Sequence, residues 1–243
     1  RASSVALFGM AFGVGFILGP ILGGAVGMLG ERVPFLLSVA LSLAASAVVA
    51  RLPNVKGRLQ WSFKIELGLL TAAVLLLNFS FSMFESLLTY YAADVFRMSP
   101  DQIGILMFVI GLSAVAGQVA VRRLEGRTRA KTAAAVGLVV MGVGSSLIAL
   151  RTVELLYLGA VAASMGQLIA SANLFAVASE VGGARGLNFG MLQSAGSLGR
   201  LVGPATAGLI YTGAGPSYVF LASALVAVAA VPLVLKSLGL KAE

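Results

Sequence analysis

The chain has 243 residues, of which 59% are hydrophobic and 11% are charged, and its mean hydropathy is +1.00. A soluble domain normally carries about 25% charged residues, so this composition excludes an ordinary soluble protein and indicates a membrane protein. The sequence contains no histidine and no cysteine, which leaves no imidazole or thiol for metal binding or nucleophilic catalysis.

Apolar runs long enough to cross a hydrocarbon core, about 18 to 25 residues each, recur along the whole chain. We predict eight transmembrane helices, at residues 4–29, 33–50, 67–96, 101–121, 132–150, 155–179, 187–211 and 218–235. The fourth has a clear start at Ser99-Pro100-Asp101-Gln102, which combines a cap residue, a proline at the first helical position and a glutamine. Strands of a membrane barrel need only about 10 residues, so the fold class is an all-α membrane protein.

The basic residues alternate from loop to loop if the chain crosses the membrane at each predicted span. One side carries Arg1, Arg51, Lys56, Arg58, Lys64, Arg122, Arg123, Arg127, Arg129, Lys131, Arg185, Lys236 and Lys241. The other side carries Arg32, Arg97 and Arg151. By the positive-inside rule the first side is cytoplasmic, so both ends of the chain are expected on the cytoplasmic face of the cell (inner) membrane. The net charge of +8 therefore reflects topology, and nucleic acid is not an expected partner.

A glycine and proline motif occurs twice in the chain. The first span contains Gly15-x-x-x-Gly19-Pro20-x-x-Gly23-Gly24, and the seventh contains Gly199-x-x-x-Gly203-Pro204-x-x-Ala207-Gly208. Similar segments this far apart indicate duplicated halves, here of six spans each. We expect the last two spans of an N-terminal six-helix bundle at 1–52, a cytoplasmic linker at 53–66 and a complete C-terminal six-helix bundle at 67–243. About four further N-terminal spans of the same protein are expected upstream.

The first copy of this motif resembles the antiporter motif of the major facilitator superfamily, particularly its drug/proton antiporter branch, which includes the tetracycline efflux pumps. The resemblance covers the chain as spans five to twelve. It implies a small-molecule substrate, protons and the lipid bilayer as partners, and no cofactor. In that family the motif packs tightly against a neighbouring helix and is thought to close the leak path that faces the cytoplasm. The resemblance carries this role to Gly15, Gly19, Pro20, Gly23 and Gly24.

A second resemblance concerns the loop after the fourth span. Residues 124–129, with Gly126 and Arg127, resemble the weaker second copy of the family's cytoplasmic gating loop. The loop lacks the aspartate of the full pattern, so a solvated basic loop without a gating role is an equal alternative.

The spacing of the glycines has a physical meaning of its own. Gly15, Gly19 and Gly23 recur every four residues on one helix face, where they allow another helix to approach closely. Pro20 removes one hydrogen-bond donor and should bend the span. The alternative is a static packing seam with no moving part.

Polar residues inside the spans are candidates for the lining of a central cavity, because each is costly in hydrocarbon. The third, sixth and seventh spans carry them at helical spacing: Asn78, Ser82, Glu85 and Thr89; Ser164, Gln167 and Ser171; Gln193, Ser197 and Arg200. The alternative for each hydroxyl or amide is a hydrogen bond between helices.

Glu85 and Arg200 are the ionisable residues that lie well inside predicted spans. Each needs a partner or water, and the two could pair with each other. We predict that Glu85 binds a proton during transport, since loss of water favours a neutral carboxyl group. A structural hydrogen bond is the alternative for Glu85. Arg200 either anchors its helix or contacts the substrate.

No enzyme signature is present: the sequence has no phosphate loop, no close carboxylate pair and no metal-ligand cluster. We therefore predict a secondary active transporter that exports small organic, drug-like compounds in exchange for protons by alternating access. The alternatives are proton-coupled uptake of a small metabolite and a truncated membrane module that does not transport.

Overall fold

The computed structural model describes residues 18, 22, 26, 29–30, 32–51, 65–124, 130–181 and 185–239, and within these ranges the chain forms helices and no strand. The helices are α2 (Val33–Ala50), α3 (Ile65–Phe96), α4 (Pro100–Leu124), α5 (Ala130–Ile148), α6 (Val153–Glu180), α7 (Arg185–Gly213), α8 (Pro216–Ala229) and α9 (Val231–Gly239). They belong to two units, Arg1–Leu59 with α2 and Gln60–Glu243 with α3 to α9. The all-α class predicted from the sequence is confirmed.

Five of the described segments are long and apolar enough to cross a membrane: Val33–Ala50, Leu67–Phe96, Ala130–Ile148, Val153–Ser179 and Pro216–Ser237. Their limits follow the predicted spans closely. The helices α4 and α7 lie at the predicted fourth and seventh spans but are less apolar, because both carry polar residues along their length. The first predicted span, 4–29, falls almost entirely outside the described residues, so the count of eight stays a prediction.

The helix α2 shows how serine is accommodated in an apolar helix. The hydroxyls of Ser38, Ser42 and Ser46 donate to backbone carbonyls four residues earlier, at 2.9, 2.8 and 2.9 Å. Each hydroxyl is therefore satisfied within its own helix, which lowers the cost of placing it in lipid.

The start of α4 confirms the predicted cap. The backbone N–H of Ser99 donates to the side-chain oxygen of Gln102 at 2.9 Å, and the backbone N–H of Gln102 faces the Ser99 hydroxyl at 3.5 Å. The preceding turn reverses at Arg97, whose φ of 53° is in the left-handed region. The turn before α6 reverses in the same way at Arg151, with φ of 60°.

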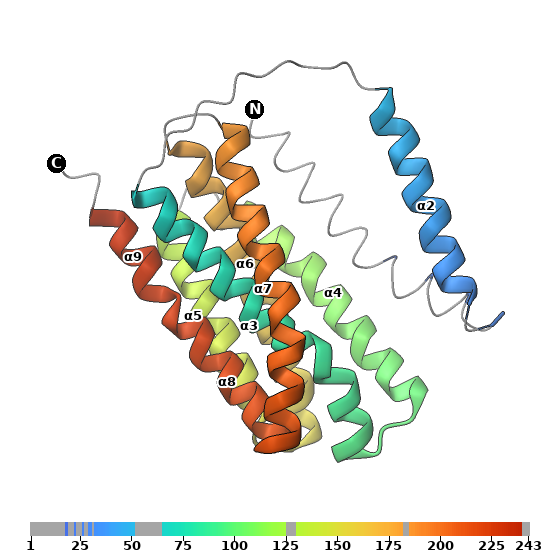
Figure 1. Ribbon diagram of the computed structural model, residues 1–243. Coiled ribbons are helices and arrows are strands. Elements are labelled where there is room, and N and C mark those ends of the chain that lie inside the picture. Colours follow the sequence, from blue (N-terminus) through green and yellow to red (C-terminus); the bar gives the residue numbers. More distant parts are fainter. Residues whose placement is uncertain are drawn as a thin grey trace. The chain divides into compact units, whose positions relative to one another are not determined.

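The last predicted span, 218–235, is divided into α8 and α9 at Ala230. Pro232 has no backbone N–H, so the helical hydrogen bond to the carbonyl of Val228 cannot form there. The two helices together still make one apolar segment, Pro216–Ser237. In Figure 1, α9 continues the course of α8 along the bundle.

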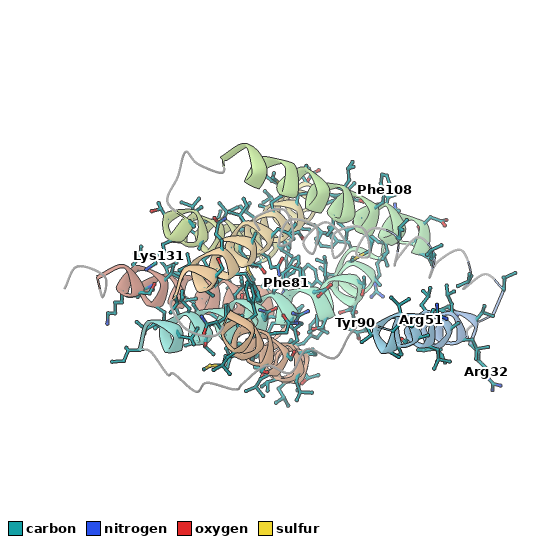
Figure 2. All side chains as sticks on the ribbon, turned by 90° about the horizontal axis from the view of Figure 1, so that it is seen from above. Arg32, Arg51, Phe81, Tyr90, Phe108 and Lys131 are labelled. Atoms are coloured by element: carbon teal, nitrogen blue, oxygen red, sulfur yellow. The ribbon has the colours of Figure 1, made fainter. Side chains whose placement is uncertain are left out.

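The second unit is a helix bundle in which α5 packs on α6 and α3 packs on α7. The helices α8 and α9 pack against both α3 and α5, and α4 packs against α6 (Figure 1). Large side chains fill the interior, as Phe81 does, while Phe108 is 59% exposed on the outside of α4 (Figure 2). Apolar side chains on the outside are suited to lipid.

Glycine brings α5 and α6 together backbone to backbone. A Cβ atom added at Gly137 would lie 2.6 Å from the backbone nitrogen of Ala170, and one added at Gly159 would lie 2.5 Å from the carbonyl oxygen of Gly144. Side chains of any size would separate the helices at these points, so the close approach depends on glycine.

Some polar groups in the interior are paired across helices. The hydroxyl of Ser80 in α3 donates to the carbonyl of Ser223 in α8 at 2.7 Å, and the Ser223 hydroxyl donates to the carbonyl of Ser80 at 3.0 Å. Lys131 at the start of α5 is buried, and its ammonium donates to the carbonyl of Ser237 near the end of α9 (Figure 2). A cation at the carbonyl end of a helix is favourable.

Candidate functional site

The second copy of the glycine motif lies where α7 packs against α3, the helix that carries the predicted polar stripe. A Cβ atom added at Gly199 would lie 2.5 Å from the carbonyl oxygen of Leu75 and 2.7 Å from the backbone nitrogen of Phe79. At Gly203 it would lie 2.9 Å from the carbonyl oxygen of Phe79. Backbone atoms cannot yield as a flexible side chain can, so both positions require glycine.

The close contact between α7 and α3 does not include every glycine of the motif. Gly208, its last glycine, has nothing within 4 Å of an added Cβ atom. Gly196, which precedes the motif, does take part, because its added Cβ atom would lie 3.0 Å from the amide nitrogen of Asn78. We call the line formed by Gly196, Gly199 and Gly203 against α3 the α3–α7 seam.

Pro204 lies inside α7, directly after the seam. Since proline has no N–H, the carbonyl of Arg200 four residues earlier loses its helical donor. The hydroxyl of Ser82 in α3 donates to this carbonyl at 3.1 Å. Ser82 thus supplies from a neighbouring helix the hydrogen bond that proline removes, as a backbone group in lipid requires.

Replacing Ser82 by alanine is expected to leave the Arg200 carbonyl without a donor and to destabilise the protein by about 1–2 kcal/mol. Pro204→Ala restores the N–H, so Ser82→Ala should have little effect in that background. Thermal unfolding of the detergent-solubilised full-length protein measures this double-mutant cycle. Equal losses in both backgrounds would show that the hydroxyl does not replace the missing donor. Ser146→Ala is a control, because its hydroxyl donates to Gly142 within its own helix.

The polar stripe predicted on α3 is divided by burial into two parts. Asn78 is buried and its amide donates to the carbonyl of Val74 at 2.9 Å, while Ser82 is buried in the seam. Glu85 is exposed and Thr89 is half-buried. The first two residues therefore satisfy the backbone and pack the helices, and the last two are available to a ligand.

The polar stripe predicted on α7 is exposed along its whole length. Gln193, Ser197 and Arg200 are all exposed, and among the described residues none of their side chains has a hydrogen-bond partner. On α6, Gln167 and Ser171 are half-buried and likewise make no side-chain hydrogen bond within the described part of the chain. The helix α6 packs against both α3 and α7, so the three stripes belong to neighbouring helices.

Glu85 follows Ser82 by three residues on α3, and the Ser82 hydroxyl contacts the carbonyl of Arg200 on α7, so the two charged residues lie at the same level of the α3–α7 pair. They do not form a direct ion pair, and neither has another side-chain partner in the described ranges. Both side chains are exposed on the second unit. The α3–α7 pair therefore carries one carboxylate and one guanidinium that make no hydrogen bond within the described ranges and are free to bind a proton or a ligand.

Several predicted site residues lie outside the described part of the chain. They are Gly15, Gly19, Pro20, Gly23, Gly24, Gly126 and Arg127. The roles that the resemblance gives them stay predictions. Among the described residues there is no group of acidic side chains that could hold a metal ion.

The sequence did not indicate one polar link between α3 and α7. The hydroxyl of Tyr211 donates to the Asp94 carboxylate at 2.7 Å, and the ring of Tyr211 meets that of Tyr90 edge to face, with centroids 5.2 Å apart. These contacts join the C-terminal ends of the two helices. Their signal in the sequence is weak, because tyrosine near the end of a span is common as an interfacial anchor.

The comparisons with known proteins agree with this architecture. The sequence profile described as Major Facilitator Superfamily matches residues 70–241. The crystal structure of the human organic anion transporter MFSD10 (TETRAN) is similar, with a TM-score of 0.80 and 25% sequence identity over 96% of this chain. The chain spans 63% of the length of that protein. A search of curated protein sequences gave no match. Both matches agree with a multi-pass membrane protein.

Proposed function

Because the chain belongs to the major facilitator superfamily, we propose that it is part of a secondary active transporter that exports small organic, drug-like compounds in exchange for protons by alternating access. The complete protein would pair this C-terminal bundle with an N-terminal one, to which the first unit and four upstream spans would contribute. The ligand would bind between the two bundles, as in other transporters built from repeated halves.

The observation that carries this proposal is the presence of an exposed carboxylate, Glu85, and an exposed guanidinium, Arg200, at the same level of two tightly packed helices. A charge inside a span is costly, and ionisable residues there usually mark a transport pathway. Uptake of a proton by Glu85 removes its charge and changes the electrostatic balance with Arg200. Such a change can bias the exchange between two orientations of the bundles.

We also propose that both ends of the chain face the cytoplasm, because the basic residues gather in alternate loops. Since the chain has no cysteine of its own, single cysteines can be placed at Arg127 and Gly213 and labelled from one side of the membrane. The two should react from opposite sides. Reaction of both from the same side would contradict the topology.

Glu85→Gln is the main test of proton exchange, because glutamine has the size of glutamate and can donate and accept hydrogen bonds as the protonated acid does, but it cannot titrate. In proteoliposomes that hold the full-length protein, a pH gradient should drive efflux of a fluorescent organic compound such as dansylglycine, and a protonophore should stop it. The variant should lose most of the gradient-driven component, about tenfold or more for a required proton-transfer group. Glu154→Gln is a matched control at an exposed acidic residue at the start of α6. Unchanged pH dependence would assign coupling to residues elsewhere.

Proton-coupled uptake is a second candidate, favoured by Arg200. When Glu85 is protonated, Arg200 loses the charge that compensates its own, and an anionic solute could replace it. Reversing the pH gradient in the same vesicles separates the two candidates, since a symporter moves solute with the protons and an exchanger moves it against them. No gradient-driven movement in either direction would favour the module without transport.

A further inference from the structure

Four of the described polar side chains of α7 make no hydrogen bond within the described part of the chain, namely Gln193, Ser194, Ser197 and Arg200. Gln193, Ser197 and Arg200 are spaced by four and three residues, which places them on one helix face. All three are exposed and have no hydrogen-bond partner among the described residues.

The two threonine hydroxyls on the same helix behave differently. Thr206 and Thr212 donate to the carbonyls of Val202 and Gly208 within α7, both at 3.0 Å. Ser197 makes no such bond to its own backbone. Unlike these threonines, its hydroxyl remains available to a partner from outside α7.

The chemistry of the three groups points to a ligand of negative charge. A guanidinium has five N–H donors and no acceptor, an amide has two donors, and a hydroxyl has one. An anionic group with several oxygen atoms, such as a carboxylate or sulfonate, accepts hydrogen bonds from all of them and matches the planar fork of arginine. An organic cation would place a second positive charge next to Arg200, and like charges repel strongly away from water.

The backbone beneath Arg200 is held firmly. Gly199 and Gly203 place α7 directly against α3, and the Ser82 hydroxyl binds the Arg200 carbonyl itself. Arg200 therefore projects from a fixed point of the helix pair, and a site on rigid elements binds its ligand with less loss of entropy.

We propose that Gln193, Ser197 and Arg200 bind an anionic group of the transported compound, which makes the substrate an organic acid or a zwitterion with an acidic group. This inference rests on the proposed transport function and names the substrate class. An anionic ligand fits this helix face better than another helix of the protein would, because the face presents hydrogen-bond donors around a full positive charge.

Two probes with the same fluorophore and opposite charges test the proposal. Dansylglycine carries a carboxylate and dansylcadaverine an ammonium group, and the emission of both reports binding to the detergent-solubilised full-length protein. The wild type should bind dansylglycine more tightly. Arg200→Gln should weaken dansylglycine by at least about tenfold, and Arg200→Lys should weaken it less, because lysine keeps the charge and loses the planar fork. Arg97→Gln, at an exposed cation outside α7, should change nothing.

Gln193→Ala and Ser197→Ala provide a second test of the proposed site. Both side chains are exposed and unpaired in the described structure, so their loss should not impair folding. Each should weaken dansylglycine about threefold to tenfold and leave the melting temperature unchanged. Preference for dansylcadaverine, or equal dansylglycine binding by wild type and Arg200→Gln, would overturn the proposal. The proposal would also be overturned if the changes at Gln193, Ser197 and Arg200 each lowered the melting temperature without weakening dansylglycine binding. That result would show that this face packs against another helix. Normal anion binding without gradient-driven transport would support the site and reject the proposed function.

Discussion

Replacing Gly166 by leucine is expected to prevent the second unit from folding, because α6 meets the backbone of α5 at this residue. A Cβ atom there would overlap the backbone nitrogen of Met141 and lie 2.5 Å from the carbonyl oxygen of Gly137. Overpacking by single methylenes in a core costs about 1–3 kcal/mol. A whole leucine side chain against a backbone should exceed that and consume much of a typical stability of about 5–15 kcal/mol.

Size-exclusion chromatography of the detergent-solubilised protein measures this effect, and we expect aggregated protein in place of a single symmetric peak. Gly104→Leu is the matched control, because nothing lies within 4 Å of an added Cβ atom at Gly104 in α4. Gly166→Ala should fall between the two. A monodisperse Gly166→Leu protein with the melting temperature of the wild type would show that α5 and α6 are not in backbone contact at this residue.

The parts of this structure that depend on local sequence could be predicted. Hydropathy located α2, α3, α5 and α6 because a membrane span needs a minimum apolar length whatever its neighbours are. The residues Ser99 and Gln102 located the start of α4 because a cap needs only groups within one turn of each other. The repeat of the glycine motif marked Gly199 and Gly203, and both lie in a close helix contact.

The parts of the structure that depend on which helices pack against each other could not be predicted. Gly137 and Gly144 in α5, like Gly159 and Gly166 in α6, are separated by seven residues, a spacing that places them near one helix face. That spacing could have signalled a close contact, but many glycines share it, and the sequence does not say which helices meet.

The role of Ser82 illustrates the same limit more clearly. As one member of a polar stripe it was a candidate for the cavity, yet its hydroxyl is used by the Arg200 carbonyl. The need for that bond can be read from Pro204, which removes the N–H of α7. The identity of the donor follows only from the packing of α7 on α3, so the stripe on α3 contributes fewer free groups than its sequence suggested.

Gly199→Leu is expected to abolish transport with less effect on membrane insertion, because insertion depends on hydropathy and the seam depends on shape. The added side chain would meet the carbonyl oxygen of Leu75, 2.5 Å from the Cβ position, and push α7 away from α3. Such a shift would move Arg200 relative to Glu85. Errors of about 1 Å in a functional site already impair it, so we expect less than about one tenth of wild-type transport.

Gly208→Leu provides the matched control on the same helix, since the space around Gly208 is open in the described structure. Both variants gain the same apolar side chain, so differences in hydropathy cancel and the comparison isolates the seam. Initial rates of gradient-driven dye movement in proteoliposomes, normalised to the amount of inserted full-length protein, give the readout. We expect Gly208→Leu to retain most of the wild-type rate because its side chain displaces no backbone. Similar rates for the two variants would mean that close contact between α3 and α7 is not needed for transport, and Arg200 would then have to be positioned by the first half of the protein.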